Sequence, residues 1–185
     1  EKLDAEISTP KLGLIYYDLA FGGAYYAIVN GSHLGLSSGS TIGEFIEVGM
    51  DIKNSIIKET EIEHPTMTDM NFLYGTIFTF EPLDKKNHSR NVCVFANGEV
   101  DRSPTGTGVS ARAAVHYKRG EIKLNETLTI ESILGSTFKV SVLRETNLSS
   151  INAIIPEVEG TANIVGKNTF WIDPDDDIGQ GFMLR

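Results

Sequence analysis

One stretch of the sequence, DRSPTGTGVSARAAVHYKRGE from Asp101 to Glu121, constrains the fold more than any other. It places a proline and two glycines just before Ser110 to Tyr117, an alanine-rich run that is typical of a helix. Because Ala111, Ala113 and Ala114 are small, neighbouring backbone can approach this helix closely. We therefore expect a central, largely buried helix with other elements packed around it.

The residues before this helix can form a binding site for an anion. A helix start leaves several N–H groups without intrahelical partners and carries a partial positive charge. Glycines let a ligand approach the amides near Thr105, Gly106 and Thr107, and Asp101 adds a negative charge just upstream. An anion site beside a carboxylate suits a zwitterion such as a small amino acid. Short glycine-rich motifs are weak signals, and a glycine turn before a capped helix without a ligand explains these residues equally well.

A second helix is predicted from Thr41 to Lys58. Its apolar residues recur at the three-to-four-residue spacing of an amphipathic helix, and Thr41 and Glu44 have the spacing of a capping box. Gly49 and Lys53 fall on the same stripe as the large apolar residues. We expect this stripe to pack on a sheet.

The rest of the chain is dominated by segments with strand-like patterns. "FGG" at Phe21 to Gly23 separates the first of these segments as a hairpin or bulge would. Strands with two helices predict an α+β or mixed α/β fold. The predicted strands are Leu12 to Ala20, Tyr25 to Val29, Gly75 to Phe80, Asn91 to Phe95, Thr127 to Ser132, Thr137 to Leu143, Ile151 to Val158 and Ala162 to Ile172.

Charge and cysteine content exclude some classes of protein. The net charge is −9 and no cluster of Lys and Arg stands out, which argues against a nucleic-acid partner. No apolar run reaches the ~18 residues of a membrane helix, so no membrane partner is expected. The sole cysteine, Cys93, rules out an internal disulfide, and its apolar context "NVCVF" favours a buried strand residue over a nucleophile. Without a disulfide framework, we expect a reducing compartment and a cytoplasmic location.

The long motif from Asp101 to Glu121 closely resembles the second active-site motif of the proline racemase family. That family includes proline racemases, 4-hydroxyproline 2-epimerases and trans-3-hydroxy-L-proline dehydratases. Further segments match in the same order, so that the resemblance covers nearly the whole chain. They are DLAFGGAYYAIV (Asp18 to Val29), HP (His64-Pro65), VCVFANGEVDRSP (Val92 to Pro104), ESILGSTFKV (Glu131 to Val140) and DPDDDIGQGFML near the C-terminus.

The resemblance implies a fold like that of diaminopimelate epimerase. In that fold two similar halves each wrap a sheet around a central helix, and the active site lies between them. Residues 1–185 are identified as the C-terminal half, one domain, whose last residues could return to the missing N-terminal domain. The resemblance also implies a homodimer when the protein is complete.

The resemblance implies a role for each candidate site residue. Asp101 is similar to the acid that holds the ring nitrogen of the substrate. The amides of Gly106 and Thr107, with Thr105, are similar to the group that binds the substrate carboxylate, and Phe95 resembles an aromatic residue that lines the pyrrolidine pocket. A catalytic cysteine is expected in the first half, within a Met-Cys-Gly-His motif that this sequence lacks. No metal, flavin or pyridoxal cofactor is implied.

Thr105 departs from the pattern of the racemases and epimerases, which carry cysteine at this position. A cysteine thiol has a pKa near 8.5 and can act as a base, whereas a threonine hydroxyl is far too weak an acid. Threonine is instead what the trans-3-hydroxy-L-proline dehydratases have, so Thr105 is the predicted catalytic residue of a dehydratase. The alternatives are a proline racemase or 4-hydroxyproline 2-epimerase, and a non-catalytic protein that binds an amino acid. This chain alone is expected to show no turnover.

Overall fold

The computed structural model describes residues 2–37, 39–179 and 181. The described part contains two α-helices and two short 3-10 turns, η1 (Ser32–Leu34) and η2 (Thr68–Met70). The helices are α1 (Ile42–Glu59) and α2 (Gly106–Lys118), and the strands are β1 (Lys2–Thr9), β2 (Gly13–Phe21), β3 (Tyr25–Asn30), β4 (Leu73–Phe80), β5 (Ser89–Phe95), β6 (Glu99–Val100), β7 (Thr127–Glu131), β8 (Thr137–Leu148) and β9 (Ile151–Glu159).

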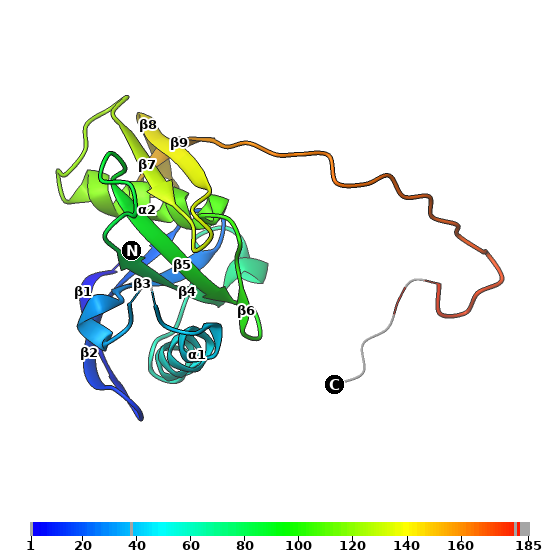
Figure 1. The fold of residues 1–185 in the computed structure, drawn as a ribbon, viewed down its shortest axis with the longest axis horizontal. Helices are drawn as coiled ribbons and strands as arrows, with labels where there is room; N and C mark the ends of the chain where they lie inside the picture. The colour runs from blue at the N-terminus through cyan, green and yellow to red at the C-terminus, as the bar shows by residue number, and fades with distance from the viewer. Residues whose placement is uncertain (1, 38, 180, 182–185) are drawn as a thin grey trace.

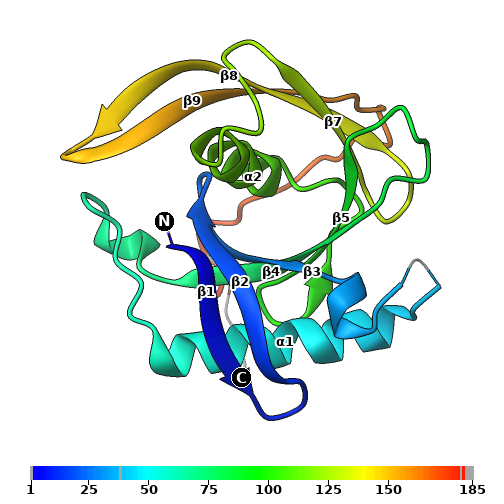
Figure 2. The same ribbon diagram turned by 90° about the vertical axis from the view of Figure 1, so that its left-hand side faces the viewer.

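The nine strands of the described residues form one mixed sheet that wraps around α2. Its order is β1-β2-β3-β4-β5-β7-β8-β9, with β6 paired to β5. The pairs β3–β4 and β5–β7 are parallel and the others are antiparallel. Figure 2 shows α2 enclosed between the β8–β9 hairpin and the strands β2 to β5, while α1 lies on the outer face. The predicted α+β class, with a sheet wrapped around a central helix, is confirmed.

Helix α1 begins and packs as its sequence predicts. The Thr41 side chain accepts a hydrogen bond from the Glu44 amide, and the Glu44 carboxylate accepts one from the Thr41 amide at 2.6 Å. This capping box satisfies donors that the first turn would otherwise leave free. The buried face includes Phe45, Gly49 and Ile52, and a Cβ on Gly49 would lie only 2.8 Å from the Val94 side chain. The glycine therefore lets α1 lie close against β5.

Helix α2 packs against backbone as closely as its small residues allow. A Cβ on Gly22, in the turn between β2 and β3, would lie 2.2 Å from the Thr107 carbonyl oxygen and 2.3 Å from the Ala111 amide nitrogen. Real Cβ atoms do not approach backbone so closely, so only glycine fits this turn. The "FGG" segment thus forms the β2–β3 turn, and its glycine lets the backbone of this turn lie directly against the first turns of α2.

The C-terminal residues differ from the prediction. The strand expected from Ala162 to Ile172 is wrong, because none of these residues pairs with a strand of the described chain. Figure 1 shows the segment after β9 running away from the body of the fold. Its large apolar side chains are exposed, with Val165 at 98% and Trp171 at 92%. A strand-like sequence becomes a strand only beside a partner, and in the described structure this segment pairs with no edge of the sheet.

Candidate active site

The chain reaches the candidate site through a hairpin that ends beside β5. The Gly98 amide donates to the Phe95 carbonyl at 3.0 Å, which closes the predicted turn. The Asp101 amide then donates to the Cys93 carbonyl at 3.0 Å, so the returning chain stays paired with β5. This pairing fixes where Asp101 stands relative to the strand, and α2 starts five residues later at Gly106.

Asp101, Ser103 and Thr105 form a closed turn of hydrogen bonds. The Asp101 carboxylate accepts from the Ser103 amide through Oδ1 at 2.8 Å and from the Thr105 hydroxyl through Oδ2 at 2.9 Å. The Thr105 amide donates to the Ser103 hydroxyl at 3.0 Å. Each carboxylate oxygen has a second lone pair, so Asp101 can still accept a hydrogen bond from a ligand. The Thr105 amide, in contrast, is already occupied, which removes it from the predicted group of anion-binding donors.

Thr105 adopts a backbone conformation that threonine rarely takes. Its φ is 70° and its ψ is 102°, and a β-branched residue in this region is strained. The side chain is buried, with 5% of the residue exposed. Such strain persists only where surrounding contacts hold it. The hydrogen bonds to Asp101 and Ser103 are two of those contacts.

The start of α2 is left open to a ligand. Thr105 is the N-cap residue, yet its side chain makes no capping hydrogen bond, and its hydroxyl donates to Asp101. The first intrahelical bond of the helix runs from the Val109 amide to the Thr105 carbonyl at 2.8 Å. The amides of Gly106 and Thr107 precede it, and both residues are exposed. A Cβ on Gly106 would meet no atom of the described chain within 4 Å, so this glycine leaves open space directly beside the helix start.

An aromatic cluster connects Phe95 to this helix start. The Tyr26 hydroxyl and the Thr107 hydroxyl are hydrogen-bonded at 2.7 Å. The ring of Tyr26 lies 5.9 Å from that of Tyr74, which in turn lies 5.3 Å from Phe95. Phe72 adds a half-exposed ring 6.2 Å from Tyr74. The sequence analysis named Phe95 alone, although strand alternation through "AYYAIV" and "FLYG" puts Tyr26 and Tyr74 on the α2 face as well.

Lys53 holds the strand ends that carry these aromatic rings. Its ammonium group donates to the Tyr74 carbonyl at 3.0 Å and to the Ala96 carbonyl at 2.6 Å. Burial lowers the pKa of Lys53 from its ordinary value. Because Lys53 comes from α1 and lies on its buried face, the outer helix fixes the ends of β4 and β5 beside the site.

Cys93 lies in β5 beside Thr105, and its thiol is unreactive. The residue is 1% exposed in the middle of β5, which confirms the predicted buried strand position. Burial raises the pKa of its thiol to about 12, although a hydrogen bond with the Thr105 side chain acts in the opposite direction. The thiol is therefore protonated at neutral pH and supplies neither a nucleophile nor a base.

The family model described as "Proline racemase" matches residues 1–183 of this chain. The chain belongs to the proline racemase family. The resemblance to this family that the motifs indicated is confirmed over nearly the full length of the sequence.

Members of the proline racemase family with several named activities are similar to this chain. A trans-3-hydroxy-L-proline dehydratase from Colwellia psychrerythraea is 46% identical over 183 residues, which are 98% of this chain and 52% of the relative. A 3-hydroxyproline 2-epimerase from Burkholderia multivorans is 40% identical over 183 residues, 98% of this chain and 55% of the relative. A proline racemase from Clostridioides difficile is 37% identical over 185 residues, 100% of this chain and 55% of the relative. The chain thus spans about half the length of the curated relatives it matches.

Solved structures of the proline racemase family have the same fold. The structure of a hydroxyproline epimerase from Agrobacterium vitis, with bound trans-4-hydroxy-L-proline, superposes with a TM-score of 0.86 at 34% identity. The match covers 100% of this chain and 53% of that one. The fold like that of diaminopimelate epimerase, which the sequence implied, is confirmed.

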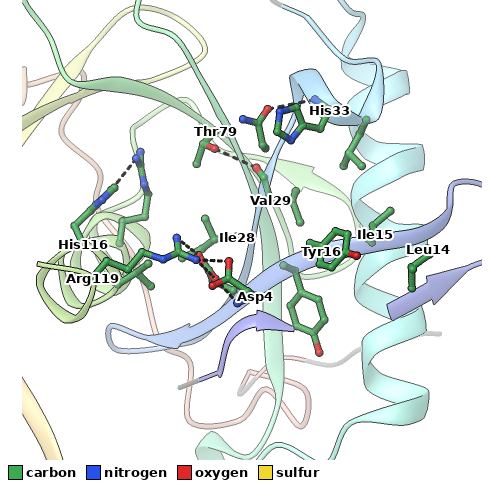
Figure 3. Close-up of a pocket in the computed structure, with 16 residues that line it drawn as sticks. Asp4, Leu14, Ile15, Tyr16, Ile28, Val29, His33, Thr79, His116 and Arg119 are labelled. Carbon is green, nitrogen blue, oxygen red and sulfur yellow. Dashed lines mark hydrogen bonds and ion pairs between the residues drawn. The ribbon is translucent and has the colours of Figure 1, made fainter. Parts of the chain in front are cut away.

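A separate cavity lies at the opposite end of α2 from Gly106. It has a volume of about 490 Å³ and is lined by residues of β1 to β3, by η1, by Thr79 of β4 and by the second half of α2 from Arg112 on (Figure 3). Arg119 lies at its wall and donates to both oxygens of Asp18 at 2.9 Å and to Asp4 at 2.6 Å. None of the predicted site residues lines this cavity.

No helix in the described part of the chain has both the length and the apolar composition that crossing a bilayer takes.

Proposed function

We propose that the complete protein containing this chain dehydrates trans-3-hydroxy-L-proline to pyrroline-2-carboxylate, a cyclic imine acid. The observation that carries the proposal is Thr105, a hydroxyl residue standing between Asp101 and an open helix start. The resemblance implies cysteine at this position in racemases and epimerases, and threonine in dehydratases. A dehydratase is also among the relatives with the higher identity to this chain, at 46%.

The arrangement of polar groups fits a proline-like zwitterion. We propose that the substrate carboxylate binds at the amides of Gly106 and Thr107, where the helix start favours negative charge. The ring nitrogen, which is positively charged, lies at the Asp101 carboxylate. The pyrrolidine ring contacts Phe95, and the Tyr74 ring packs against Phe95 with ring centroids 5.3 Å apart.

In this proposal a cysteine of the first half removes the α-proton. The electron pair left at the α-carbon spreads into the carboxylate, and the donors at the start of α2 stabilise that charge. The C3–O bond then breaks, hydroxide leaves and takes up a proton as water, and a C2–C3 double bond forms. Tautomerisation of this enamine gives the cyclic imine acid. The Thr105 hydroxyl retains lone pairs that can accept a hydrogen bond from the leaving group or from a nearby water.

Neither the Thr105 hydroxyl nor its described neighbour Cys93 can act as a second base on the opposite face of the α-carbon, and Asp101 is assigned to the ring nitrogen in this proposal. The threonine hydroxyl donates a hydrogen bond to the Asp101 carboxylate and is too weak an acid to ionise. Cys93, the neighbouring thiol, has a pKa of about 12 because it is buried. Inversion at the α-carbon needs a base on each face, so this site favours elimination over racemisation or epimerisation.

We expect the complete protein to consume trans-3-hydroxy-L-proline and to leave L-proline unchanged. The test incubates the protein with each compound, follows the imine product by its reaction with 2-aminobenzaldehyde, and measures the chirality of recovered proline. Formation of D-proline would contradict the proposal and support a racemase, and inversion of 4-hydroxyproline would support an epimerase. Binding without any turnover would support a non-catalytic amino-acid-binding protein.

A Thr105→Cys variant tests whether threonine is the discriminating residue. A correctly placed second base adds about a hundredfold or more in rate, so the variant should gain weak epimerase activity well above the wild-type background. Because the Cys93 thiol is hydrogen-bonded to the Thr105 side chain, the new thiol could form a disulfide with it. The same change in a Cys93→Ser background is therefore the matched control. A folded variant that binds substrate but gains no inversion would show that another residue decides the outcome.

We also propose that residues 160–179 pack on the N-terminal half of the complete protein. Their apolar side chains are exposed here, and a strand-like sequence without a partner is what a segment crossing to another domain would have. Trp171 is the sole tryptophan of this chain, so a difference spectrum between wild type and Trp171→Phe isolates its fluorescence. We expect blue-shifted emission in the complete protein and red-shifted emission in this chain alone. Red-shifted emission in both would contradict the packing.

The homodimer and the cytoplasmic location remain predictions for the complete protein.

A further inference from the structure

A buried guanidinium group lies in the middle of α2, and two successive hydrogen bonds through Asn91 connect it to the backbone of the candidate site. Arg112 is 4% exposed, and its Nη1 donates to the Asn91 side-chain oxygen at 2.7 Å and to the Ser89 hydroxyl at 2.8 Å. Both partners are neutral groups of β5. A buried charge is costly unless its hydrogen bonds are satisfied, so this arrangement needs an explanation.

Asn91 connects Arg112 to the backbone of the candidate site through two hydrogen bonds. Its side chain is 1% exposed, and while its oxygen accepts from Arg112, its Nδ2 donates to the Pro104 carbonyl at 2.9 Å. Since Arg112 can only donate, the orientation of the Asn91 amide is fixed. Asn91 therefore cannot rotate away from Pro104 without losing its bond to the buried guanidinium group.

The Pro104 carbonyl belongs to the same rigid peptide plane as the Thr105 amide. On one side of that plane the carbonyl accepts from Asn91, and on the other side the Thr105 amide donates to the Ser103 hydroxyl. Rotation of the plane changes φ of Thr105, which stands at the strained value of 70°. The two hydrogen bonds thus hold the backbone that aims the Thr105 hydroxyl and begins α2.

The far side of Arg112 is also held by a neutral group. Its Nη2 donates to His116 Nε2 at 3.1 Å, so the ring proton sits on Nδ1, which bonds the Glu121 carboxylate at 2.5 Å. Burial and the neighbouring Arg112 charge lower the pKa of His116 to about 4, which keeps the ring neutral and able to accept. The ring of His88 packs against it at 4.9 Å. Arg112 is therefore fixed at both ends of its guanidinium group.

We propose that Asn91, oriented by Arg112, is a positioning residue that fixes the Pro104–Thr105 peptide and thereby the Thr105 hydroxyl and the first amides of α2. The proposal rests on the proposed function, because it assigns Asn91 to the same site. Neither residue touches the substrate in this proposal. They act through the backbone that carries the groups which do.

The variant Asn91→Asp in the complete protein separates positioning from packing. Aspartate has nearly the same size and pairs with Arg112, so we expect the variant to fold, with a lower melting temperature because a buried hydrogen bond is lost. The Pro104 carbonyl, however, loses its donor and faces a carboxylate oxygen. Misplacement of a reacting group by about 1 Å costs about a hundredfold, so we expect kcat to fall ten- to a hundredfold while KM changes less than about threefold.

Ser89→Ala is the matched control, because it removes the other β5 partner of Arg112 without touching Pro104. Its kcat should stay within about threefold of wild type. Hydrogen exchange at residues 103–107 gives a readout that needs no turnover, and exchange there should accelerate in Asn91→Asp but not in Ser89→Ala. Unchanged exchange and unchanged kcat in Asn91→Asp would overturn the proposal. A wild-type protein that fails to dehydrate, with exchange still accelerated in Asn91→Asp, would overturn the proposed function and leave the positioning role supported.

Discussion

Replacement of Asp101 by asparagine should lower kcat/KM of the complete protein for its proline-like substrate by about a hundredfold to a thousandfold. Asparagine can still accept from the Ser103 amide, and its amide can bond the Thr105 oxygen, so the local turn is preserved. What disappears is the negative charge that, in the proposed function, holds the ring nitrogen. Steady-state kinetics measures the loss, and circular dichroism checks that the fold is retained.

Asp84→Asn is the control for this prediction. Asp84 also accepts a hydrogen bond from the amide two residues later, from Lys86 at 3.0 Å, but it lies in the exposed loop after β4. The two substitutions therefore remove the same charge from the same kind of turn. Equal kinetics in the Asp101 and Asp84 variants would show that Asp101 does not bind the ring nitrogen.

Replacement of Gly106 by alanine should abolish most substrate binding without weakening the fold. The new Cβ meets no atom of the described chain within 4 Å, and Gly→Ala in a compatible helical position stabilises by about 0.4–1 kcal/mol. Cβ atoms of a helix tilt toward its N-terminus, which is where the substrate carboxylate is proposed to sit. We expect affinity to fall by about thirtyfold or more, measured by calorimetry with the substrate.

Gly43→Ala supplies the comparison, since Gly43 lies in the first turn of α1 and the one described atom within 4 Å of its Cβ would be the Thr41 hydroxyl, at 3.9 Å. It should raise stability by a similar amount and leave binding unchanged. Tight binding by Gly106→Ala would remove the start of α2 as the carboxylate site and require another location for it.

The parts of this fold that were predicted correctly are those governed by local sequence. The capping box of Thr41 and Glu44 and the apolar stripe of α1 depend on neighbouring positions only, and both are present in the structure. The turn at Gly98 and the buried strand position of Cys93 are of the same kind. Strand β1 was missed, although Ala5 and Ile7 alternate with polar residues as a half-buried strand requires.

The errors arise where distant parts of the chain decide the structure. Ala162 to Ile172 has the composition of a strand, but pairing depends on a neighbour that the sequence of the segment does not specify. The Thr105 amide was expected near the anion site, and in the structure it donates to the Ser103 hydroxyl, at a residue whose φ of 70° the sequence does not specify. Tyr26 is 81 residues from Thr107 in the sequence, so its hydrogen bond to that residue became visible only in three dimensions.

The contact between Gly22 and the first turns of α2 also limits how the site can move. Side chains can change rotamer to accommodate a shift, whereas two backbones in direct contact have nothing to rearrange. The β2–β3 turn and the beginning of α2 are thus constrained to move as one rigid block. A movement of this end of α2 would therefore carry with it the β2–β3 turn and Tyr26, whose hydroxyl is hydrogen-bonded to Thr107.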